Sequence, residues 1–221
     1  MDDRTTLEPP ASTANLSGAP PLRFNTFLTG MLLAVAALLP SQASGDNLAG
    51  KLAAAAVSRT HHPVRYDGSY IPMAYPGGDV PADIGVCTDV IIRSYRAVGI
   101  DLQRLVHEDM SDHFDAYPSR RLWGLSTPDP NIDHRRVPNL RTFFSRKGQK
   151  LPVSRRAGDY LPGDIVTWML PGNLPHIGLI AEARSSTTET PMVVHNIGAG
   201  PRLEDMLFRY RITGHYRFPP R

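Results

Sequence analysis

The order of the local patterns along the chain constrains the fold most. Residues 164–170, 176–183, 191–197 and 210–218 have the apolar alternation of strands, and turns rich in Pro, Gly, Ser or Thr separate them. The segments before them carry helical spacing of apolar residues, over 47–59, 87–98, 101–110 and 139–146. Helices followed by consecutive strands predict an α+β fold with a small antiparallel sheet.

The N-terminal region has the pattern of a secretory signal. Residues 24–40 are mostly apolar, and small residues follow that suit cleavage after Ala43. The run is shorter than the roughly 18–20 residues that a membrane span needs, so we expect cleavage rather than a permanent anchor. We therefore expect a signal peptide with a long leader, residues 1–43, and one exported domain, residues 44–221, in the periplasm or outside the cell. Contact with the membrane would be transient.

The charge and the cysteine count limit the function. The net charge is +3, and the basic residues are interspersed with acidic ones, which indicates a solvated surface rather than a nucleic-acid interface. The chain has a single cysteine, so it has no internal disulfide. An exported protein with one unpaired thiol is a candidate for thiol chemistry or for pairing with another molecule.

That cysteine, Cys87, follows a loop rich in Gly, Pro and Asp and opens a helical pattern. A thiol in the first turn of a helix faces unpaired backbone N–H groups and the positive end of the helix dipole, which favour the nucleophilic thiolate. Asp89 in the same turn opposes thiolate formation. The alternative is a small buried apolar residue, the usual role of a free cysteine.

Two histidines downstream favour the chemical role. His176 begins one predicted strand and His195 lies late in the next. Neighbouring antiparallel strands can place such side chains together on one face. If the Cys87 helix packs on that face, Cys87 meets His176 as its base, and His195 orients His176, as in a catalytic triad.

Other segments offer candidate contacts. Tyr75 lies in the irregular loop before Cys87 and is either a packing ring or part of a cleft wall. The polar segment 128–139 contains Asp133, His134 and Arg135, and it is either a plain surface loop or a loop that contacts substrate. Trp123 is expected to fill the core.

A metal site is a further alternative. The acidic and histidine residues near 107–113 match none of the close zinc spacings, so we expect a solvated face and no metal or organic cofactor. A metal-dependent hydrolase would use His107, Asp109, His113 or His134.

Several motifs resemble the NlpC/p60 cell-wall peptidases, which are papain-like cysteine hydrolases. Gly85-Val86-Cys87-Thr88-Asp89-Val90 resembles their nucleophile helix, and Pro175-His176-Ile177-Gly178-Leu179 resembles the strand with the base. Val193-Val194-His195-Asn196 resembles the strand with the third, polar member. Leu161-Pro162-Gly163-Asp164 resembles their Pro-Gly-Asp strand entry.

The chain is still more similar to the bacterial group called domain of unknown function 1287, over about residues 50–219. That resemblance rests on Gly-Val-Cys-Thr-Asp, on Asn-Ile-Asp-His-Arg-Arg-Val-Pro-Asn-Leu and on Val-Val-His-Asn-Ile-Gly.

The resemblance implies a papain-like fold and cleavage of an amide bond, with peptidoglycan stem peptides as substrate. It implies Cys87 as nucleophile, His176 as base and His195 as third member. Tyr75-Pro76-Gly77-Gly78 resembles the segment whose tyrosine lines the family's active site, and Asn196 is a further candidate contact.

Val86 stands where the family has an aspartate that recognises the substrate's free amine. The usual γ-D-glutamyl–diaminopimelate specificity is therefore not implied. Asp89 either replaces that acid or simply favours the helix start. A non-catalytic wall-binding module of the same fold remains an alternative.

Overall fold

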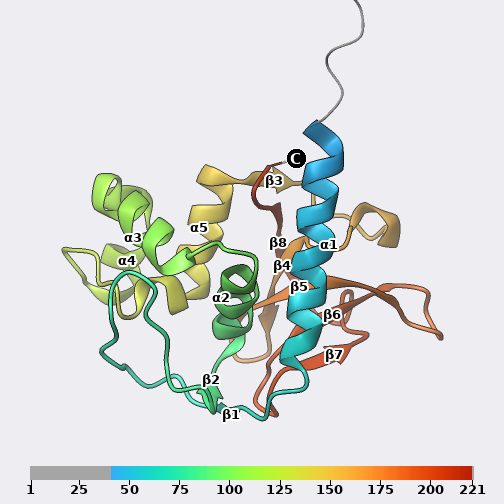
Figure 1. The fold of residues 1–221 in the computed structure, drawn as a ribbon. Helices are drawn as coiled ribbons and strands as arrows, with labels where there is room; N and C mark the ends of the chain where they lie inside the picture. Colours follow the sequence, from blue (N-terminus) through green and yellow to red (C-terminus); the bar gives the residue numbers. More distant parts are fainter. Residues whose placement is uncertain (1–40, 221) are drawn as a thin grey trace, which may run out of the picture. The chain divides into compact units, whose positions relative to one another are not determined.

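An antiparallel sheet of six strands, in the order β3-β8-β4-β5-β6-β7, carries the site (Figure 1). The computed structural model describes residues 41–220, so the expected signal segment lies outside the described residues. The strands are β3 (Gln149–Leu151), β4 (Ile165–Leu170), β5 (Leu174–Arg184), β6 (Pro191–His195), β7 (Arg202–Glu204) and β8 (Arg211–Arg217). The predicted α+β fold is confirmed. The four longest strands match the sequence patterns, whereas β3 and β7 are short edge strands that those patterns do not signal.

Helices precede the sheet in the chain, as predicted. They are α1 (Ser41–Arg59), α2 (Cys87–Ala97), α3 (Leu102–Asp112), α4 (Ser119–Trp123) and α5 (Val137–Lys147). A two-stranded parallel pair, β1 (Arg65–Tyr66) and β2 (Ile84–Gly85), leads into α2. The first helix begins six residues before the predicted start at residue 47. No helix within residues 41–220 is long and apolar enough to cross a membrane.

Local sequence explains where these helices begin and end. Asp101 caps α3, because its carboxylate accepts hydrogen bonds from the backbone N–H groups of Gln103 and Arg104. Gly99 adopts a φ of 82° just after α2, a conformation that favours glycine. Pro138 lies in the first turn of α5, where its missing N–H costs nothing.

The two faces of the sheet carry separate apolar clusters. Helices α1, α2 and α5 cover the face that presents Ile177 and Leu179 of β5 (Figure 1). The opposite face presents Trp168, Ile180 and Val193, and residues of the segment after β7 pack on them.

The prediction that Trp123 fills the core is wrong. Its side chain is 38 % exposed, and the Arg136 guanidinium lies 4.1 Å from the centre of its ring. Trp168 is instead fully buried, and its indole N–H donates to the carbonyl oxygen of Leu207 at 2.9 Å. Trp123 ends a short helix, so local periodicity held too little information to place it.

Candidate active site

Cys87 is the first residue of α2 and is only 5 % exposed. The backbone N–H groups of Ile177, Thr88 and Cys87 itself lie near its sulfur and act to lower its pKa. Two of these donors belong to the first turn of α2, and the third belongs to β5. The thiol therefore lies where the start of the helix meets the strand that carries His176.

The thiol is neutral in this resting state. Burial raises the pKa of Cys87 to about 12, and the nearby Asp89 carboxylate adds to the rise. The three backbone N–H donors favour the thiolate but do not offset the burial. The sequence predicts that the start of the helix favours the thiolate. The backbone N–H groups are present as expected, but the loss of solvation on burial raises the pKa of the thiol by more than these groups lower it.

The two histidines form a hydrogen-bonded pair on neighbouring strands. His176 Nε2 lies 3.1 Å from His195 Nδ1, and the two rings meet edge to face with centroids 5.2 Å apart. Both side chains are buried. Burial lowers the pKa of His176 to about 3 and also lowers the pKa of His195, so both rings are neutral at neutral pH. These two strands do place the two rings together on one face.

The expectation that the Cys87 helix packs on that face is not met. His176 lies opposite Trp168 in the β4–β5 register, so its ring is on the face turned away from α2. Cys87 instead belongs to the apolar cluster on the helix side, with Ile177. The described β5–β6 pairing begins only at Leu179, and the backbone N–H of Ile177, two residues earlier, lies near the Cys87 sulfur at the start of α2.

The hydrogen bond to His195 occupies Nε2 of His176 and leaves Nδ1 as the nitrogen for a thiol proton. Among the described residues, no hydrogen bond joins the Cys87 thiol to this ring. Catalytic hydrogen bonds are often long before substrate binds and shorten in the substrate complex. Ile177, whose backbone N–H lies near the Cys87 sulfur, directly follows His176 in β5.

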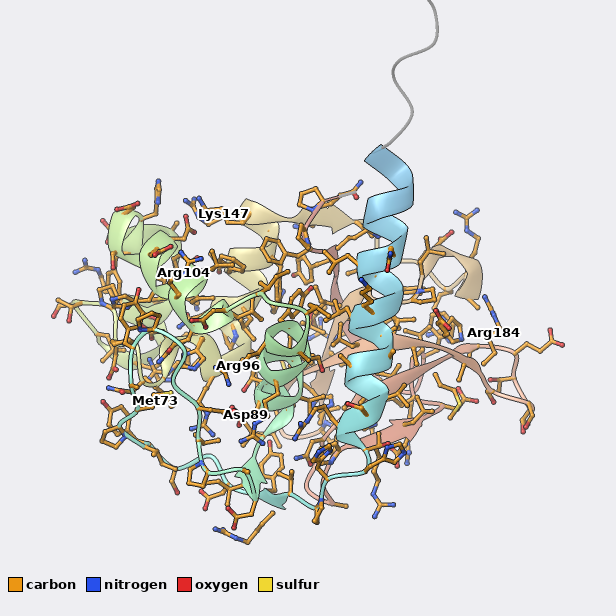
Figure 2. The ribbon with its side chains drawn as sticks, in the orientation of Figure 1. Met73, Asp89, Arg96, Arg104, Lys147 and Arg184 are labelled. Atoms are coloured by element: carbon orange, nitrogen blue, oxygen red, sulfur yellow. The ribbon has the colours of Figure 1, made fainter. Side chains whose placement is uncertain are left out.

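Asp89 is engaged within the protein. Its carboxylate accepts two hydrogen bonds from the Arg135 guanidinium, Nε to Oδ1 at 2.9 Å and Nη2 to Oδ2 at 3.0 Å. Oδ2 also accepts from the backbone N–H of Val86 at 2.7 Å. Asp89 lies at the start of α2 (Figure 2). Thr88 adds a hydrogen bond from its hydroxyl to the Arg135 carbonyl oxygen. These contacts fix the first turn of the Cys87 helix.

The rest of the 128–139 segment is also turned inward. Asp133 accepts hydrogen bonds from the backbone of Asp129 and from the Arg136 guanidinium. His134 is buried, with no partner for Nδ1, and burial lowers its pKa to about 4. The structure thus places these side chains in the interior that supports α2.

Asn196 supports the loop on the other side of Cys87. Its side-chain N–H donates to the carbonyl oxygen of Gly85 at 3.5 Å, and its Oδ1 accepts from the backbone N–H of Gly198 at 2.9 Å. The residue after His195 thereby connects β6 to the segment that leads into Cys87.

Tyr75 packs on α3, and a second tyrosine, Tyr66, lies near the Cys87 thiol. The ring of Tyr75 meets the ring of His107 on α3, with centroids 4.9 Å apart. Tyr66 on β1 pairs with Gly85 and is affected electrostatically by Cys87. Burial and then the nearby Cys87 raise its pKa to about 12. The two-residue strand β1 is too short to leave a periodic signal in the sequence.

The structure offers no support for the metal alternative. Within the described part of the chain, no three His, Cys, Asp or Glu side chains are arranged to hold a metal ion. Asp109, the central acid of the predicted cluster, instead bonds Arg146 at 2.7 Å and the Tyr117 hydroxyl at 2.7 Å.

Sequence reasoning also missed the partner of His195. Glu204 on β7 places Oε2 3.1 Å from His195 Nε2. Beside this pair is a cavity of about 380 Å³, which Arg202, Arg209 and Tyr210 also line. The alternation Arg202-Leu203-Glu204 is the one signal that the sequence offers, and three residues are too few to identify a strand.

Comparison with known proteins supports the motif resemblance. The family model described as domain of unknown function (DUF1287) matches residues 53–218. "Uncharacterized protein YijF" of Escherichia coli (strain K12) is 52 % identical over 153 residues, covering 69 % of this chain and 73 % of that protein.

Two solved structures, NlpC1 and NlpC2 from Trichomonas vaginalis, are similar at a TM-score of 0.41 and 15 % identity over 77 % of this chain. The chain spans 44 % and 47 % of their lengths, less than half of each. The family match covers most of the chain, including all three predicted catalytic positions. The chain therefore belongs to the DUF1287 family.

Proposed function

We propose that this protein is a cysteine hydrolase that cleaves an amide bond, with peptidoglycan stem peptides as its substrate class. One observation carries the proposal. His176, which is hydrogen-bonded to His195, directly precedes Ile177, and the backbone N–H of Ile177 lies near the Cys87 sulfur. The motif resemblance to cell-wall peptidases supports the substrate class.

The proposed reaction has two stages. Cys87 Sγ attacks the carbonyl carbon while its proton passes to His176 Nδ1, and the C–N bond breaks as that proton moves to the leaving amine. A water molecule then gives a proton to His176 Nδ1 and attacks the thioester carbon. The C–S bond breaks, the acid product leaves, and His176 returns the proton to the sulfur, which restores the thiol. His195 holds the His176 ring throughout. The backbone N–H groups of Cys87 and Thr88 can stabilise the oxyanion, and a donor of this kind contributes roughly 3 to 4 kcal/mol in well-studied hydrolases.

The substrate must also reorganise the site. A neutral, buried thiol is a poor nucleophile, so the substrate carbonyl has to enter next to Cys87 as the proton transfers. The proposed chemistry uses no metal or organic cofactor.

Digestion of purified peptidoglycan, with mass spectrometry of the released fragments, tests the proposal. Fragments should form with the wild-type protein and vanish with Cys87→Ala and His176→Ala. His61→Gln, at an exposed position after α1, is the matched control and should retain activity. Fragments that persist in a folded Cys87→Ala protein would exclude the covalent mechanism and leave only the fold in common with the cysteine hydrolases.

The second candidate is a non-catalytic wall-binding module, which the neutral, buried thiol favours. This reading predicts that the protein sediments with peptidoglycan, releases no fragments and is unaffected by Cys87→Ala.

We also propose that the protein is exported and cleaved after Ala43, from the sequence pattern of residues 24–43. Cell fractionation and N-terminal sequencing test this. The exported protein should begin at Ser44, whereas an intact N-terminus in the cytoplasm would refute the proposal.

A further inference from the structure

A hydrogen bond from His195 to the Glu204 carboxylate extends the pair of His176 and His195. In the β6–β7 register, Glu204 pairs with Val193 and Arg202 pairs with His195. Glu204 and His195 are therefore diagonal neighbours on one face of the sheet. The 3.1 Å contact between Oε2 and Nε2 ends a chain of hydrogen bonds that runs through two buried rings to a side chain that is 42 % exposed.

The direction of each hydrogen bond in this chain follows from its last member. An ionised carboxylate only accepts, so Nε2 of His195 must carry the proton. In a neutral ring, Nδ1 of His195 is then an acceptor, and it must receive its hydrogen bond from Nε2–H of His176. A neutral His176 that is protonated at Nε2 has its lone pair on Nδ1, the nitrogen that must take the thiol proton.

We propose that Glu204 is a positioning residue that fixes the tautomers of both His195 and His176, so that His176 Nδ1 is unprotonated before the reaction. The inference rests on the proposed function. No proton moves to Glu204. When His176 accepts the Cys87 proton and becomes an imidazolium, the carboxylate stabilises the positive charge through His195.

The charged groups around His195 have opposite effects on a positive charge at its ring, and Glu204 is one of them. Arg202 lies opposite His195 on β7, Arg209 lines the same cavity, and the His176 ring is its partner on β5. Arg209 disfavours a positive charge on His195, whereas Glu204 favours it. Glu204 is thus the group that opposes the electrostatic effect of Arg209 at this ring.

The first test needs no substrate. Long-range ¹H–¹⁵N spectra of the labelled full protein report which nitrogen of each ring carries hydrogen. Both His176 and His195 should be Nε2-protonated in the wild type. Glu204→Gln, whose amide can also donate, should populate Nδ1-protonated rings and lower the pKa of His195. Glu182→Gln, which removes an exposed carboxylate from β5, is the matched control and should change neither.

The second test uses the fragments of the peptidoglycan assay. Glu204→Gln should lower kcat by about 10- to 100-fold with little change in KM, because general acid–base catalysis contributes about 10²- to 10⁴-fold and the variant should lose part of it. Glu182→Gln should leave both constants unchanged. Wild-type tautomers and an unchanged His195 pKa in a folded Glu204→Gln protein would overturn the proposal. A shift in tautomers in a protein whose wild type cleaves nothing would support the positioning role and refute the hydrolase instead.

Discussion

Asp89 and Arg135 form a buried, two-pronged ion pair behind the first turn of the Cys87 helix, with N–O distances of 2.9 and 3.0 Å. Both side chains are almost completely inaccessible. Arg135 also donates to the carbonyl oxygens of Ser69 and Asp67, so one guanidinium connects the 128–139 segment, the loop before Cys87 and α2. The start of the helix depends on this pair.

Removal of the arginine should therefore be costly. Arg135→Met leaves the Asp89 carboxylate buried without its cation, and we expect a loss of about 3–5 kcal/mol in the free energy of unfolding. Urea denaturation measures the change. Arg156→Met, which breaks an exposed ion pair with Asp159, is the control and should change the free energy little. Equal losses in the two variants would contradict the structural role of Arg135.

The Cys87 thiol should react slowly in the native protein. Because burial raises its pKa to about 12 and little of it is exposed, alkylation by iodoacetamide at pH 7–8 should be far slower than in urea-unfolded protein. The native rate should rise with pH well beyond pH 9. Mass spectrometry of the modified peptide follows both rates, and rapid native labelling at pH 7 would show an accessible thiolate instead.

Acid should destabilise the fold over a defined range. The pKa of His176 is about 3 in the folded protein and about 6.5 in an unfolded chain. Between these values the unfolded state binds a proton that the folded state does not, so stability falls as the pH drops from 6.5 towards 3.

His176→Gln should reduce this loss, since glutamine does not titrate. The exposed His61→Gln variant is the control and should follow the wild-type curve. Urea midpoints at several pH values test the prediction, and identical slopes for all three proteins would contradict it.

A methyl group at Gly178 should disturb the histidine pair. An added Cβ would lie 2.7 Å from Cγ1 of Val193 and 3.2 Å from Cβ of His195. Gly178→Ala should therefore destabilise the protein by about 1–3 kcal/mol, as overpacking does, and should displace His195 from His176. At Gly158 an added Cβ meets nothing within 4 Å, so Gly158→Ala is the matched control. Thermal unfolding and peptidoglycan digestion measure the two effects.

The sequence was informative where a feature is local and periodic. The Cys87 helix, the capping by Asp101 and the four longest strands all appear in spacing and cap residues. The pairing of His176 with His195 followed from two adjacent strands, because only one register choice was needed.

The features that the sequence left unresolved depend on contacts between distant segments. Which sheet face α2 covers is decided by packing of the whole helix layer, and the inward turn of Arg135 is decided by Asp89, 46 residues earlier. Glu204 and Tyr66 lie on strands of three and two residues, too short for a pattern. Local periodicity carries no information about such partners.

The burial of the single thiol has a consequence for the protein before it meets any substrate. Two copies of a chain with an accessible thiol can become linked through a disulfide wherever an oxidant is present, and sulfenic acids form at exposed thiolates. A neutral sulfur enclosed by α2 and β5 offers neither route. Burial therefore protects the thiol against linkage between copies and against oxidation.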